Sequence, residues 1–310
     1  METRVQLEHP EVRTSDKPSA VPSVSLASAS RWLAGNVDTL LLAVLLVVAF
    51  WPILYSMAGS WFDENAYMEH GVLVIPAAAY MAWTNKEKLK QIPRRPSAWG
   101  VLLLLWGALQ ASFGMVAQWT WVARMAFLIS LVGYIAALWG WRTVRELVYP
   151  LCTLILMIAP PSFVFERITL SLQLLASRLG EVCLEALGYS VLREGNILEM
   201  VGIKLSVEEA CSGIRSLVAI FFMCVLYNYF FVEGRSMKAL LLVMAIPIAI
   251  LGNAVRIVAT GVAGQYNPAL VSGATHEAFG YVSVVFAALG CVVFHLGMKS
   301  AVEKWRNYHV

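Results

Sequence analysis

Long apolar runs separated by short polar segments dominate the chain between residues 37 and 297. A bilayer core of about 30 Å needs roughly 20 apolar residues in a helix. Backbone groups in lipid must be hydrogen-bonded within their own segment, which favours helices. The pattern therefore predicts eight transmembrane helices, of which the second is short and the fifth is broken by Pro160-Pro161: 37–58, 71–84, 99–117, 121–140, 147–163, 211–232, 239–260 and 277–297.

Two segments between the fifth and sixth apolar runs follow other patterns. Residues 162–187 carry apolar positions at helical spacing with charged residues between them, which is typical of an amphipathic helix lying on a membrane. Residues 190–207 are expected to form two short strands, each ending at a glycine-containing turn. The predicted fold is an all-α integral membrane protein with an outer amphipathic helix and a short β-hairpin before the sixth span.

Composition agrees with lipid as the solvent, since 59% of residues are hydrophobic and only 14% are charged, against about 25% charged in soluble domains. The net charge of +3 and the absence of a dense basic block argue against a nucleic-acid partner. Residues 1–36 are charged and rich in Ser and Pro, as in a disordered tail. Residues 37–298 are expected to form one transmembrane domain, followed by a short tail over 299–310.

The orientation of the chain in the membrane is predicted from the positions of Lys and Arg, which are in excess in cytoplasmic loops. Lys/Arg-rich segments follow the second, fourth, sixth and eighth spans, whereas the first loop and residues 261–275 contain neither residue. The alternation predicts a multi-pass inner-membrane protein with both termini in the cytoplasm.

On this topology, three residues with side chains common in catalysis lie near the outer ends of the sixth, seventh and eighth spans. Cys211 begins the sixth span, where the helix dipole and nearby Arg215 favour a thiolate. Arg256 lies in the seventh span, and an intramembrane arginine is costly unless it has a function. Asn253 lies one turn earlier on the same helical face, and His276 opens the eighth span. A thiol, a guanidinium and an imidazole at one depth can supply a nucleophile, an oxyanion stabiliser and a proton shuttle.

Each residue also has a simpler interpretation. A membrane cysteine is usually inert packing, Arg256 could extend to the headgroups, and His276 could cap its helix. The five cysteines lack metal or disulfide spacing, and His70, His276 and His295 lack ligand spacing, so no cofactor or metal is expected. The rival functions are a transporter that uses Arg256 and His276 for ligand or protons, and a non-catalytic membrane subunit.

Four motifs make the chain resemble the exosortase/archaeosortase family of membrane cysteine transpeptidases. They are EACSGIR at 209–215, NAVRI at 253–257, HEAFG at 276–280 and, near the start, WFDENAYMEHGVLVIP at 61–76. The resemblance implies that Cys211, Arg256 and His276 are catalytic. Residues expected to support them or to bind substrate are Glu209, Ser212, Arg215, Asn253 and His70.

The same resemblance implies an activity and a partner. Exported proteins would be cleaved at the outer membrane face through a Cys211 thioester. Their C-terminal sorting signal would contain a short motif such as Pro-Glu-Pro, a transmembrane helix and a basic cluster. The thioester would then pass to an amine or hydroxyl acceptor, or to water.

Overall fold

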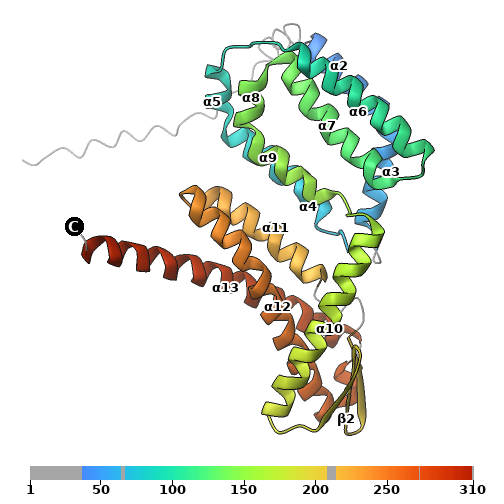
Figure 1. Cartoon of the computed structure of the whole chain (residues 1–310), viewed down its shortest axis with the longest axis vertical. Helices are drawn as coiled ribbons and strands as arrows, with labels where there is room; N and C mark the ends of the chain where they lie inside the picture. Colours follow the sequence, from blue (N-terminus) through green and yellow to red (C-terminus); the bar gives the residue numbers. More distant parts are fainter. Residues whose placement is uncertain (1–36, 64–66, 208–213, 272, 309–310) are drawn as a thin grey trace, which may run out of the picture. The chain divides into compact units, whose positions relative to one another are not determined.

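The computed structural model describes residues 37–63, 67–207, 214–271 and 273–308, with the backbone alone between 271 and 277. The chain divides into two compact units, residues 1–46 and 47–310. Most of the first helix, α2, belongs to the first unit, and the remaining elements belong to the second (Figure 1). The helices are α2 (Val37–Ala49), α3 (Trp51–Trp61), α4 (Gly71–Thr84), α5 (Lys86–Gln91), α6 (Ala98–Val116), α7 (Thr120–Leu138), α8 (Trp141–Glu146), α9 (Val148–Thr153), η2 (Leu154–Met157), α10 (Ser162–Ala186), α11 (Ile214–Phe231), α12 (Arg235–Tyr266), η4 (Pro268–Val271) and α13 (Gly273–Tyr308).

Five described helices are long and apolar enough to cross a membrane, namely α6, α7, α11, α12 and α13. The number rises to seven if two bent pairs, α2 with α3 and Val148–Met157 with Ser162–Ala186, each count as one span. The second pair bends by 80° at the break that contains Pro160-Pro161, where proline removes a helix donor and restricts the preceding residue. The expectation of a multi-pass helical membrane protein is therefore confirmed, while α4, with 14 residues, is shorter than a full span.

Helices α12 and α13 extend beyond the apolar runs that predicted them. The predicted spans were 239–260 and 277–297, whereas the helices reach Arg235–Tyr266 and Gly273–Tyr308. Hydropathy identifies the residues that can lie in the lipid core, and it does not set the ends of the helix. A helix continues into water wherever its backbone hydrogen bonds remain intact. The predicted C-terminal tail from residue 299 is thus helical to Tyr308.

A small antiparallel sheet follows α10, and it has three strands where the sequence predicted two. The strands are β1 (Val191–Glu194), β2 (Ile197–Met200) and β3 (Ile203–Ser206) in the order β1-β2-β3. The pairs Glu194↔Ile197 and Met200↔Ile203 close two-residue turns. Gly195 and Gly202 occupy these turns with φ of +64° and +81°, a conformation that glycine adopts without steric cost.

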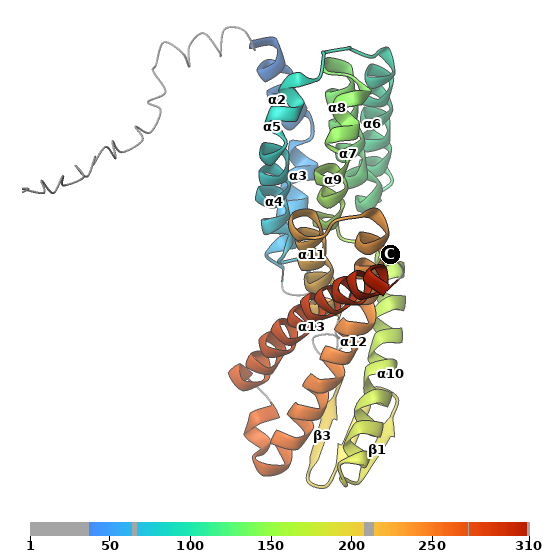
Figure 2. The ribbon, with the colours of Figure 1, turned by 90° about the vertical axis from the view of Figure 1, so that its left-hand side faces the viewer.

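The sheet packs against α10 and α12, and Figure 2 shows β1 and β3 beside these helices. Their shared core contains Leu184 of α10, Leu198 and Leu205 of the sheet, and Ile257 of α12. Arg193 also donates to the Glu181 carboxylate of α10 at 2.6 Å. Ile257 thus joins the sheet to α12, the helix that carries Arg256, and Arg193 joins it to α10.

Candidate active site

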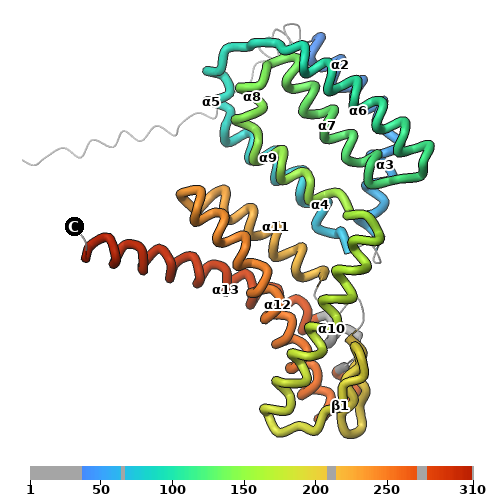
Figure 3. Tube along the Cα trace, viewed as in Figure 1, coloured from blue at the N-terminus to red at the C-terminus, as the bar shows by residue number. Residues whose placement is uncertain are grey.

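The proposed nucleophile segment lies between two well-anchored points of the chain. Glu209, Cys211 and Ser212 are outside the residues that the structure describes. Before them, Val207 is fully buried; its amide donates to the Asn196 carbonyl at 2.8 Å, and its carbonyl accepts from the Asn196 side chain at 3.1 Å. After them, Ile214 is buried at the start of α11. In the trace of Figure 3 the sheet lies beside α10, and β3 also contacts α12.

Arg256 of α12 contacts α13, the helix whose first turn contains His276. Its guanidinium lies against Gly280 of α13: a Cβ at position 280 would be 3.3 Å from both Arg256 Cζ and Nη2 and 3.6 Å from Nη1. Gly280 follows His276 by four residues, which is one helical turn, and His276 lies in the first turn of α13. The structure therefore brings two sequence-predicted motifs, NAVRI and HEAFG, into contact at Arg256.

Asn253 and Ser283 lie on the two helices that form this contact. Asn253 is buried on α12, one turn before Arg256. On α13, the Ser283 hydroxyl donates to the Gly280 carbonyl at 2.8 Å. The Gly280 carbonyl therefore already accepts a hydrogen bond within the helical turn that contacts the Arg256 guanidinium. Sequence spacing indicated Asn253, whereas Gly280 was visible only as the last letter of a motif.

Arg215 is held by the segment that precedes α4. Its Nη2 lies 3.1 Å from a Glu69 carboxylate oxygen, and its Cζ lies 5.0 Å from the Tyr67 ring centroid. Tyr67 is buried and stacks on Phe165 of α10 with centroids 6.0 Å apart. Sequence reasoning included Arg215 but missed Glu69 and Tyr67, because contacts between segments about 150 positions apart leave no local pattern.

His70 fixes the same segment to α11 and to η2. Its Nε2 donates to the Leu156 carbonyl at 3.0 Å, and its ring lies 6.0 Å from the Phe222 ring on α11. Burial lowers the pKa of His70, although the Leu156 carbonyl and the nearby Glu69 carboxylate act in the opposite direction. Phe222 follows Arg215 by two helical turns, so one face of α11 contacts residues 67–70 at both levels.

The residues that the structure describes contain no group of three His, Cys, Asp or Glu side chains able to hold a metal ion. The chemistry available near α12 and α13 is that of a guanidinium fork, which donates several N–H groups in a fixed plane. Such a fork suits an oxygen that gains negative charge during attack on a carbonyl.

The sequence profile of the family described as transmembrane exosortase (Exosortase_EpsH) matches residues 61–294. No curated protein and no solved structure matches the chain. The match spans well over half of the 310 residues and includes every motif discussed above. The chain therefore belongs to the transmembrane exosortase family, whose members are membrane cysteine transpeptidases acting on PEP-CTERM substrate proteins.

Proposed function

We propose that this exosortase cleaves its substrates through a Cys211 thioester, with Arg256 and His276 as the other catalytic residues. The observation that carries the proposal is the contact between the Arg256 guanidinium and Gly280. Residues 256 and 276 are 20 positions apart in the sequence. The contact brings the Arg256 side chain to the helical turn that follows His276, which is what a shared site requires.

The proposed reaction starts when the Cys211 thiolate attacks the peptide carbonyl that precedes the substrate's transmembrane helix. The carbonyl oxygen takes the negative charge, and Arg256 stabilises it through charge-assisted hydrogen bonds. His276 gives a proton to the leaving amine as the C–N bond breaks. The resulting thioester then transfers its acyl group to an amine, a hydroxyl or water, and Cys211 is released.

Arg215 is assigned a supporting role rather than that of the oxyanion donor. Its guanidinium already pairs with Glu69, so an oxyanion would have to compete with a carboxylate for the same donors. Glu209, Ser212, Asn253 and His70 complete the proposed supporting set. Of these, His70 has contacts that favour positioning, because its ring lies against Phe222 of α11, the helix that follows Cys211.

The proposed site lies on the outer membrane face, with both termini in the cytoplasm. The support is the loop composition: residues 86–95 contain five Lys or Arg, whereas 261–275 contain none. Outer-face chemistry also suits substrates that have already been exported.

Replacement of Cys211 by Ser tests the nucleophile. We expect Cys211→Ser to reduce cleavage of a PEP-CTERM substrate to background, because a serine hydroxyl is far less ionised than a thiol. The matched control is Cys152→Ser, since Cys152 is an exposed free thiol on α9. Cleavage should be measured by gel shift of the substrate in isolated membranes and normalised to enzyme abundance. Full cleavage by Cys211→Ser, or equal losses in both variants, would contradict the assignment.

A further inference from the structure

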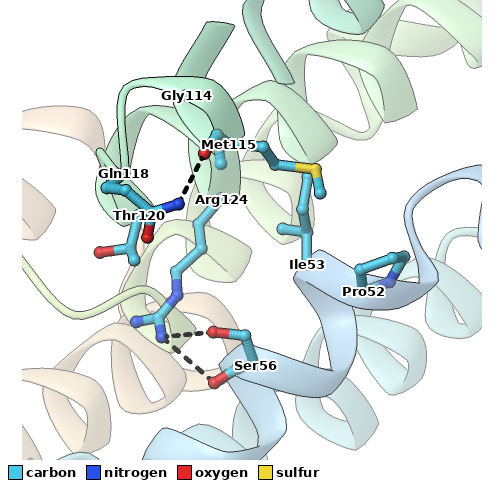
Figure 4. A pocket seen from close by; sticks show the side chains of 9 residues that line it. Pro52, Ile53, Ser56, Gly114, Met115, Gln118, Thr120 and Arg124 are labelled. Atoms are coloured by element: carbon cyan, nitrogen blue, oxygen red, sulfur yellow. Dashed lines mark hydrogen bonds between the residues drawn. The ribbon is translucent and has the colours of Figure 1, made fainter. Parts of the chain in front are cut away.

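A second polar site lies at the end of the α6–α7 pair, away from Arg256. It is a cavity of about 190 Å³ between α3, α6 and α7 (Figure 4). Arg124 of α7 lines it together with apolar side chains from α3 and α6, including Ile53 and Met115. Gln118 and Thr120, at the turn between the two helices, supply polar groups to its wall. With Ser56, the cavity has one cationic side chain, three neutral polar side chains and apolar walls, a combination that suits an amphipathic anion better than water alone.

The Arg124 side chain is only partly satisfied by the protein. Its Nη2 donates to the Ser56 carbonyl at 3.1 Å and to the Ser56 hydroxyl at 3.3 Å. Its Nε is buried and has no acceptor among the residues that the structure describes. None of the Asp or Glu side chains in the described part of the chain forms an ion pair with Arg124. The guanidinium carries five N–H donors and one full charge, so two neutral oxygens leave both donors and charge uncompensated.

The position of the cavity indicates the source of an anion to pair with Arg124. Arg124 lies in the second turn of α7, close to the α6–α7 turn that includes Gln118 with φ of +55°. Both helices are candidate membrane spans, so their shared turn lies at the level of the headgroups. Arginine within a span is costly and ordinarily faces a polar partner. Phosphate is the anion that every phospholipid carries at this level, and arginine binds it through paired N–H donors.

We propose that this cavity is a binding site for a phosphate oxyanion, delivered by the headgroup of a membrane phospholipid. Arg124 binds the phosphate, Ser56 holds the guanidinium in place, and Gln118 and Thr120 contact the headgroup at the rim. Ile53, Met115 and the neighbouring apolar side chains contact the glycerol and the first methylene groups. The site uses α3, α6 and α7 alone, so it does not depend on the assignment of the catalytic residues.

The test compares ligand-induced thermal stabilisation of the full-length protein in detergent micelles. Phosphatidylglycerol supplies the headgroup phosphate, diacylglycerol supplies the same chains without phosphate, and inorganic phosphate supplies the free oxyanion. We expect phosphatidylglycerol to raise the unfolding temperature and diacylglycerol to leave it unchanged, because a ligand that binds only the folded state stabilises it. Stabilisation by inorganic phosphate equal to that by phosphatidylglycerol would overturn the lipid source and identify a free-anion site.

Two variants test whether the stabilisation by phosphatidylglycerol depends on Arg124. Arg124→Gln should lose the stabilisation by phosphatidylglycerol, whereas Arg178→Gln, which removes an exposed cation from α10, should retain it. If Arg124→Gln does not accumulate, Arg124→Lys keeps the charge without the planar fork, and its shift should fall below half that of the wild type. An undiminished shift in either Arg124 variant, or equal losses in the Arg178 control, would overturn the proposal. Because the readout is lipid binding rather than cleavage, its result is separable from that of the Cys211 experiment.

Discussion

Three arginines of the described residues differ in how their charge is compensated. Arg215 has a carboxylate and an aromatic ring, whereas Arg124 has only two serine oxygens. Arg256 lies with its guanidinium against a glycine of the next helix. The rule that an intramembrane arginine is functional singled out Arg256 in the sequence. Applied to Arg124, the same rule would have indicated a second site, which became evident only when the Ser56 contact was known.

The distance between Gly280 and Arg256 predicts a graded effect of side-chain size at position 280. A Cβ there would lie 3.3 Å from the guanidinium, so Gly280→Ala displaces Arg256 by a few tenths of an ångström and Gly280→Val by more. We expect cleavage to fall severalfold for Ala and about 100-fold for Val, since a displacement near 1 Å can cost that much. Substrate cleavage in membranes, normalised to enzyme abundance, is the measurement.

Gly297→Ala provides the matched control for the Gly280 series. Gly297 is on the same helix, and a Cβ there would meet nothing within 4 Å. Both Ala variants gain the same helix propensity, about 1 kcal/mol, so only the contact with Arg256 distinguishes them. Equal activity of Gly280→Val and the wild type would show that the position of the Arg256 guanidinium does not matter for cleavage.

Helices α6, α7, α11, α12 and α13 were predictable from the sequence because their apolar runs are long enough to cross a bilayer. The number of strands in the sheet was harder to predict. The segment 190–207 was predicted to form two strands, each ending at a glycine-containing turn. Both turns are present, but residues 203–206 after the second turn form a third strand, β3. At the second turn, Gln265 of α12 donates to the Val201 carbonyl at 3.0 Å. This contact, between residues 64 positions apart, favours the turn in a way that local propensity does not report.

The positive φ of Gly202 leads to a prediction for the sheet. We expect Gly202→Ala to lower the free energy of unfolding by about 1–2 kcal/mol, because an L side chain with φ near +81° is strained. Gly202→Asn should cost less, since asparagine tolerates this conformation better. Thermal unfolding in detergent measures both, with Gly59→Ala in α3 as the control because a Cβ there meets no other atom within 4 Å. A Gly202→Ala variant as stable as the control would contradict the argument.

The candidate site could be predicted only in part, because it draws on segments from the whole second unit. Motif spacing identified Arg256 and Asn253, and the structure adds Gly280 as the neighbour of Arg256. The segment 67–70 was known as a motif, but its contacts with Arg215 and Phe222 depend on how α4 and α11 pack. Cys211 itself lies outside the described residues, so its role rests on the family and on the experiment proposed above.

Membrane topology depends on whether the bent pair formed by Val148–Met157 and Ser162–Ala186 crosses the bilayer. Between Arg94 and Asn267 the chain contains α6, α7, α11 and α12, which are four candidate spans, in addition to this pair. If the pair crosses once, five crossings separate the two residues and they lie on opposite sides. If the pair lies in the interface, four crossings return them to the same side. The charge of the loops favours the first case, because residues 86–95 are rich in Lys and Arg and 261–275 contain neither.

Reporter fusions distinguish these two topologies. A fusion after Arg94 should be cytoplasmic and one after Asn267 external, with alkaline phosphatase active only at the external position. A fusion after Lys304 is the control, because α13 adds one crossing and should return the chain to the cytoplasm. Cytoplasmic readings at both Arg94 and Asn267 would mean that the bent pair does not cross. The turn at Asn267 and the start of α13, with His276, would then face the cytoplasm, and cleavage at the outer face would be excluded.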